Sequence, residues 1–131
     1  MDNFAEQDFQ ELVDKYLIRH RSILDIVTKL SESTARTNRA LAKAVTICGC
    51  IRVSAKKQSF PSDINYSDLR SYMEDHIEGR LCESCQEVLE NEIGRTIFYL
   101  AALSDTLDLD LNEIIKKERL KLEALGVFNL T

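Results

Sequence analysis

Apolar residues recur along most of this chain at the spacing of one face of an α-helix. The first stripe predicts a helix near the N-terminus and consists of Phe9, Leu12, Val13, Tyr16 and Leu17. A second stripe begins near Arg21 and continues to Gly49, so it predicts one long helix. The middle of this stripe, SESTARTNRA, is small and polar, which weakens it at a place where a site can sit.

The centre of the chain lacks this periodicity. Residues 52–66 contain the only proline, Pro61, and are predicted to form a connecting loop. Ser67 can cap a short helix over residues 68–78, which Gly79 would end.

Two further helices are predicted in the C-terminal part of the chain. One starts near Leu81, and the other follows a turn at residues 106–109. Asp110 and Glu113 form a capping box for the last helix, and Gly126 ends it. The apolar faces of these helices consist of Val88, Leu89, Ile93, Ile97, Leu100 and Ala101 in the first and of Ile114, Ile115, Leu122 and Leu125 in the second.

The composition agrees with a helical chain. Only four glycines and one proline occur among 131 residues, and these are the residues that break helices. The sequence therefore predicts a single all-α domain over residues 1–131, a bundle of four to five helices. Apolar stripes this long in so short a chain favour a core completed by oligomerisation, as a homodimer or a dimer of dimers. The tail VFNLT is expected to pack on the body or on a partner chain.

Charge and hydropathy exclude several classes of partner. The net charge of −5 and the absence of tryptophan disfavour binding to nucleic acid, and the charge also disfavours an anionic membrane. No apolar run approaches the roughly 20 residues of a membrane span. The N-terminal stretch MDNFAEQDFQELVDKYL is acidic and amphipathic, unlike a signal peptide, so a cytoplasmic protein is expected.

The four cysteines form two closely spaced pairs. Cys48 and Cys50 end the second predicted helix, and Cys82 and Cys85 open the fourth. If these helices run antiparallel, the four thiols converge at one end of the bundle. Zinc takes four thiolates in a tetrahedron, so the spacing predicts a zinc site.

Other interpretations of the cysteines remain open at this point. His76 is a possible substitute ligand, although a surface histidine on a polar helix is the simpler reading. An iron–sulfur cluster also accepts four cysteines. Alternatively, the cysteines are unrelated buried residues or form a redox pair.

Acidic residues on the second and fourth helices suggest a different kind of site, since facing carboxylates can hold Mg²⁺. The segments LSESTARTNRAL and NEIGRTIFYLAALSDTLDLDLNEIIKKE resemble the MazG-like nucleotide pyrophosphohydrolases, of the all-α NTP pyrophosphatase superfamily. The resemblance covers roughly residues 23–47 and 85–122. It implies an all-α oligomer that splits nucleoside triphosphates with Mg²⁺.

The acids of that family are only partly present. Glu32 and Glu92 match the first acid of each pair, whereas Arg36 and Arg95 stand where the resemblance leads one to expect acids. Ser33 replaces a further acid. A divalent cation would therefore face two guanidinium groups, which repel it.

Three interpretations of these charges follow. Arg36 and Arg95 can form interhelical bridges with Glu92 and Glu32 in place of the metal. They can instead bind phosphate, as a guanidinium group does well. In the third, Glu87 and Glu90 join Glu32 and Glu92 in holding Mg²⁺.

The function expected from the sequence is that of a MazG-like protein with a degenerate hydrolase site. Such a protein would be a nucleotide- or partner-binding, regulatory module that carries a cysteine metal site. The alternative is an active Mg²⁺-dependent hydrolase that releases a nucleoside monophosphate and pyrophosphate. The remaining basic residues are predicted to be a solvated face and loop or else an anion-binding rim, namely Arg39, Lys43, Arg52, Lys56 and Lys57.

Overall fold

A computed structural model describes residues 8–126 of the chain. This part is mostly helical, as predicted, and contains one small antiparallel sheet of two strands. Its elements in chain order are α1 (Phe9–Tyr16), α2 (Ile23–Lys43), a π-helical segment (Ala44–Cys48), β1 (Ile51–Val53), a 3-10 helix (Tyr66–Tyr72), β2 (Ile77–Gly79), α3 (Glu83–Thr106) and α4 (Leu111–Leu125).

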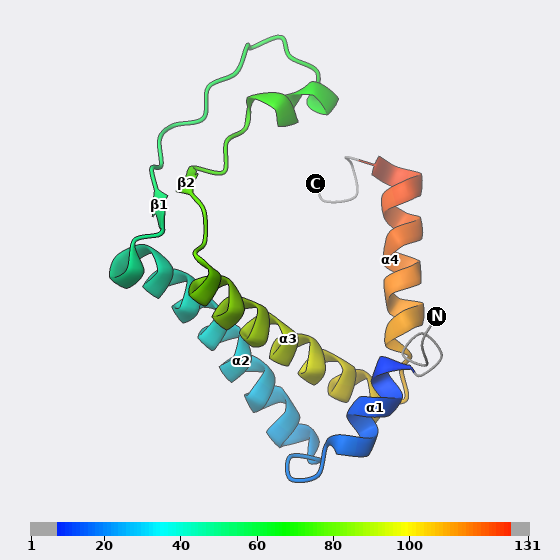
Figure 1. Cartoon of the computed structure of the whole chain (residues 1–131). Helices are drawn as coiled ribbons and strands as arrows, with labels where there is room; N and C mark the ends of the chain where they lie inside the picture. Colours follow the sequence, from blue (N-terminus) through cyan, green and yellow to red (C-terminus); the bar gives the residue numbers. More distant parts are fainter. Residues whose placement is uncertain (1–7, 127–131) are drawn as a thin grey trace, which may run out of the picture.

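The helices α2 and α3 form the centre of the molecule. They lie side by side and antiparallel, and α1 crosses one of their ends (Figure 1). The ribbon made by β1 and β2 extends from the opposite end of the pair (Figure 1). The condition under which the four cysteines were expected to converge, two antiparallel long helices, is therefore met.

The apolar core sits where α1 crosses the α2–α3 pair. Its buried members are Val13, Leu17, Ile26, Ala101 and Ala102. The alanines of α3 leave room for the larger side chains of α1 and α2, which explains the close approach of three helices at this end. The rings of Phe98 and Tyr99 pack against this cluster.

Side-chain caps fix where the helices begin. The Leu24 backbone N–H donates to the Ser22 hydroxyl at 3.3 Å. At α4 the Asp110 carboxylate accepts from two backbone N–H groups, at 2.9 and 3.3 Å, so the Asp110 half of the predicted capping box is confirmed. Gln10 on α1 ties down the same turn: its amide donates to the Leu109 carbonyl at 2.7 Å and accepts from the Leu111 N–H at 2.8 Å.

The prediction for residues 68–78 is wrong. A 3-10 helix covers Tyr66–Tyr72, and Ile77–Gly79 instead forms β2, paired in antiparallel register with Ile51–Val53. The predicted loop over 52–66 correspondingly begins inside a strand. Strands of three residues are too short to show an alternating pattern, and their partners lie far apart in the sequence. His76 has a backbone φ of 61°, which no regular helix allows.

The last helix has an uncovered apolar face. Gly126 ends α4 with a positive φ of 57°, as predicted, but no residue of α4 is buried. Its apolar stripe is exposed in the single chain and consists of Ile114, Ile115, Leu122 and Leu125. The predicted packing of the tail VFNLT lies outside the described residues. None of the described helices has the length and apolar character that crossing a membrane requires.

Candidate metal centre

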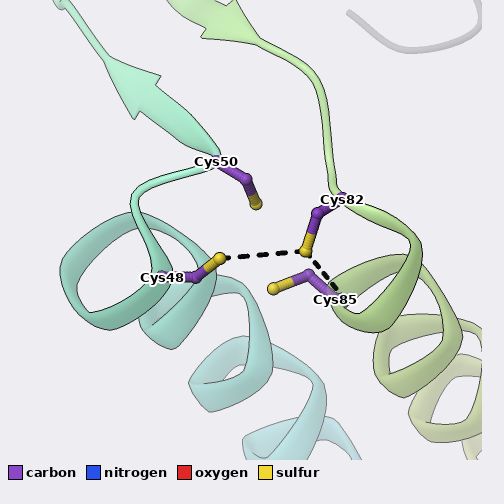
Figure 2. Close-up of side chains that lie close together, drawn as sticks. All are labelled: Cys48, Cys50, Cys82 and Cys85. Atoms are coloured by element: carbon purple, nitrogen blue, oxygen red, sulfur yellow. Dashed lines mark hydrogen bonds between the residues drawn. The ribbon is translucent and has the colours of Figure 1, made fainter.

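The four cysteines lie where two helix ends meet the ribbon. Cys48 ends the π-helical segment, and Gly49 turns the chain with a φ of 78°, so that Cys50 comes back toward the same point. Cys82 is the N-cap of α3, and Cys85 lies in its first turn. Figure 2 shows the four sulfur atoms pointing toward a common centre.

The distances between the sulfurs fit one metal ion. All four Sγ atoms lie within 4.8 Å of one another. The Sγ atoms of Cys48 and Cys82 are 3.8 Å apart. A tetrahedron with metal–sulfur bonds of about 2.3 Å has sulfur–sulfur edges of roughly 3.8 Å. The predicted convergence is therefore confirmed, and all four thiols are free rather than disulfide-bonded.

The start of α3 favours a thiolate at Cys82. The Cys85 backbone N–H donates to the Cys82 sulfur at 3.4 Å. This bond, together with the Cys85 and Cys48 side chains, lowers the pKa of Cys82 to about 7. The pKa of Cys85 shifts the other way: its hydrogen bond with the Cys82 side chain and its burial raise the pKa of the Cys85 thiol to about 12. One thiol thus ionises readily, and a bound cation would draw off the protons of the others.

The donor set decides what such an ion can do. Four cysteine ligands fill a tetrahedron and leave no position for water or substrate, which is typical of a structural zinc site. One tetrahedral ion suits this spacing better than a multi-iron cluster, because a cluster separates the thiolates by several irons and sulfides. His76 is not part of the group, so the structure does not bring this predicted substitute ligand to the site.

Gly79 allows the two sides of the site to approach each other. It has a φ of 86°, and a Cβ atom added there would lie 2.6 Å from the Cys50 carbonyl oxygen. A side chain at this position would therefore push β2, and with it Cys82, away from Cys50. Sequence reasoning missed this role because Gly79 was predicted only to end a helix.

The residues proposed for an Mg²⁺ site are arranged differently from the prediction. Glu32 points outward and pairs with Lys29 at 3.5 Å on the same helix. The neighbouring Ser33 is buried instead and donates to the Leu30 carbonyl at 2.9 Å. Thr37 and Thr96 oppose each other across the same interface, with hydroxyl oxygens 3.5 Å apart. The small polar run of α2 thus lets the two helices approach closely.

Arg36 and Glu92 form an ion pair between α2 and α3. The Nε and Nη2 atoms of Arg36 lie 3.0 and 3.4 Å from the two carboxylate oxygens of Glu92. The Glu92 side chain is only 12% exposed, so it has little access to other cations. The hydrogen bond and the charge of Glu92 raise the pKa of Arg36, which stays ionised. This is one of the two predicted interhelical bridges.

The second predicted bridge does not form. Within residues 8–126, Arg95 has no ion-pair partner, and Glu32 bonds only to Lys29. Glu87 and Glu90 are exposed on α3. The cysteines are the only group of three or more metal-ligating side chains that the described residues bring within reach of one ion. The structure therefore does not gather the four candidate acids.

A hollow of about 250 Å³ lies between α2 and α3 beside the ion pair. Its basic wall consists of Arg36, Arg39 and Lys43, and Val88 and Glu92 face them from α3. We call this surface the basic groove. The sequence placed Arg39 and Lys43 on a solvated face or an anion-binding rim. Their common face with Arg36 follows from the helical spacing. That Val88 and Glu92 form the opposite wall could be known only from the way in which α2 and α3 pair.

Comparisons of the chain with models of known protein families, with curated proteins and with solved structures found no match. The resemblance to the MazG-like family therefore stays a prediction. The evidence for function is the geometry of the cysteine site and of the adjoining α2–α3 interface.

Proposed function

We propose that this protein is a non-hydrolytic binding and regulatory module with a structural zinc ion, built on a MazG-like helical frame. The Arg36–Glu92 ion pair carries this proposal. Glu92 is the one candidate acid that is largely buried in the helix interface, and a guanidinium group occupies both of its oxygens. An Mg²⁺ ion at Glu92 would have to displace Arg36 and then lie beside its charge.

Zinc is the proposed occupant of the cysteine site. The short separations of the four sulfurs and the closed donor set support it. The ion would join the end of α2 to the start of α3 and hold both ends of the ribbon. Its role would be structural, because no coordination position remains for chemistry.

A second copy of the chain is the proposed cover for the exposed apolar residues. All of the large apolar side chains of α4 are at least partly exposed, and α3 adds Ile93, Ile97 and Leu100. Exposed apolar residues gathered on neighbouring helix faces of a single chain are typical of interfaces. Sedimentation at micromolar concentration should give twice or four times the mass of one chain, and a monomer would contradict this part of the proposal.

An assay of pyrophosphate release tests the absence of hydrolysis. The purified protein is incubated with Mg²⁺ and each of the common nucleoside triphosphates, and we expect no release above the buffer blank. Wild-type turnover that stops in Glu92→Gln would overturn the proposal in favour of the active hydrolase. In the double variant Arg36→Glu with Arg95→Asp, a gain of Mg²⁺-dependent release would show that the two arginines had replaced metal-binding acids.

A further inference from the structure

The groove between α2 and α3 continues past its basic part toward the cysteines. A second hollow of about 290 Å³ adjoins the basic groove and shares Ala40, Lys43 and Val88 with it. This second part is apolar and is bordered by Ala44 and Ile47. The two hollows therefore form one surface, basic at one end and apolar at the other.

The basic end carries positive charge that nothing in the described chain neutralises. Arg39 and Lys43 have no ion-pair partner within residues 8–126, whereas Arg36 is already paired with Glu92. The chain as a whole has a net charge of −5, so this local excess stands out against an acidic surface. A partner with carboxylates would be attracted here, and an acidic surface elsewhere on the protein would repel it.

The dimensions of the surface suit a third helix. Ile47 follows Arg36 by eleven positions along α2 and the π-helical segment, which is roughly 16 Å at the α-helical rise, or about three turns. Small side chains lie between them: Ala40 on α2, Ala44 at the start of the π-helical segment and Ser84 on α3. Small side chains let a third backbone approach to the separation of about 8–10 Å at which helices pack.

The apolar end distinguishes a helix from a small ligand. Ile47 is 75% exposed and Val88 is 48% exposed, on opposite walls of the surface. A small anion held by the cations would leave both side chains in water. A helix with an apolar row beside its acidic row would cover them and gain their burial.

We propose that this surface binds an acidic amphipathic helix of a partner protein. Its carboxylates pair with Arg39 and Lys43, and its apolar row covers Ile47 and Val88. Cys48 and Cys85 border the apolar end, so a metal bound by the cysteines would fix its shape. The inference rests on the proposed function, of which it names the partner.

The test uses a designed helical peptide of 18 residues, with glutamates on one face and leucines beside them, labelled for fluorescence anisotropy. The chain of 131 residues, purified without added metal or chelator, is titrated into the peptide. We expect saturable binding that weakens at least about tenfold in Arg39→Glu with Lys43→Glu. Ile47→Asp, at an exposed position, should weaken binding as well. Circular dichroism and metal content show that each variant is folded.

A matched control separates the groove from net charge. Lys57→Glu with Lys117→Glu makes the same change in net charge in the loop after β1 and on α4, and it should alter the affinity by less than about twofold. A peptide with lysines in place of the glutamates should not bind. If both double variants weakened peptide binding equally, net charge alone would explain the effect, and the inference would be overturned.

Other ligands give outcomes of their own. Absence of peptide binding overturns the inference, and so does competition by ATP, by inorganic phosphate or by vesicles of anionic phospholipid that displaces the peptide at comparable concentration. These failures are distinct from failure of the proposed function. A zinc-containing protein that neither hydrolyses nucleotides nor binds the peptide would keep the function and lose only this partner.

Discussion

The two ends of the α2–α3 pair are held together by different means. At the α1 end, Val13, Leu17 and Ile26 pack against the alanines of α3 and are shielded from water. At the cysteine end the buried apolar residues are few, namely Ala44, Ile51 and Leu89, and the ribbon beyond it is largely exposed. Four sulfurs converge there instead. An apolar core stabilises one end, and the other end, where few apolar residues are buried, has four cysteine sulfurs that could hold a metal.

This contrast shows how a short chain can support a long protrusion. A ribbon of two three-residue strands has too little pairing to be stable by itself. A metal ion bound by the cysteines, which lie where the two strands join the helices, would restrict the ribbon, since metal binding in small sites is coupled to folding. The predictions below separate the two ends, from the largest expected effect to the smallest.

Cys82→Ser should abolish metal binding altogether. A serine hydroxyl is a poor ligand for zinc beside three thiolates, and the protein should contain no metal after purification. Hydrogen exchange should then show faster exchange at Ile51–Val53 and Ile77–Gly79, while the amides of α1 and the adjoining part of α3 keep their protection. The control is Ser84→Ala, two positions further along the chain, which should retain the metal. Unfolding of both ends in Cys82→Ser would contradict the separation.

Ile26→Ala should destabilise the α1 end by about 2–5 kcal/mol, because Ile26 is completely buried and its removal leaves a cavity. Urea unfolding measures the loss. Ile18→Ala, at an exposed position, should stay within about 0.5 kcal/mol of the wild type. If Ile26→Ala instead released the metal at once under native conditions, the two ends would not be independent.

Gly79→Ala should cost about 1–3 kcal/mol and weaken metal retention against a competing chelator. The added Cβ would meet the Cys50 carbonyl at 2.6 Å in a backbone conformation that already disfavours a side chain. Gly49→Ala is the matched control: its φ is also positive, but a Cβ there has nothing within 4 Å. We expect backbone strain of about 1 kcal/mol without the displacement of Cys82. Equal metal retention in the two variants would refute the role given to the close approach.

Gly94→Ala should stabilise the protein by about 0.5–1 kcal/mol. Gly94 lies inside α3, has no positive φ, and an added Cβ would meet nothing within 4 Å. Alanine then reduces the entropy lost on folding. Thermal unfolding measures the gain, and the metal content should not change. A loss of stability would indicate that Gly94 is covered in the assembled protein.

The sequence predicted the features that depend on local spacing better than those that depend on which distant segments pair. The helix pattern of Phe9–Leu17, the capping residue Asp110 and the turn at Gly49 depend on local spacing, so they could be predicted from the chain alone. The convergence of the cysteines could also be predicted, because it needs only two antiparallel helices whose ends carry the pairs.

The errors lie where residues distant in the sequence meet. The pairing of Ile51–Val53 with Ile77–Gly79 has no periodic signal at three residues per strand. The orientation of Glu32 depends on which face of α2 meets α3, and Ser33 occupies that face instead. Neighbouring positions on an α-helix differ by about 100° around its axis, so a shift of one position decides whether an acid points outward or into the interface.

The most direct test of the account is elemental analysis of the purified protein, made without added metal or chelator, alongside a thiol count before and after denaturation. We predict about one zinc per chain and no reactive thiols until the protein is unfolded. Absence of metal together with four thiols titratable in the native protein would contradict the claim that a metal holds the cysteine end together.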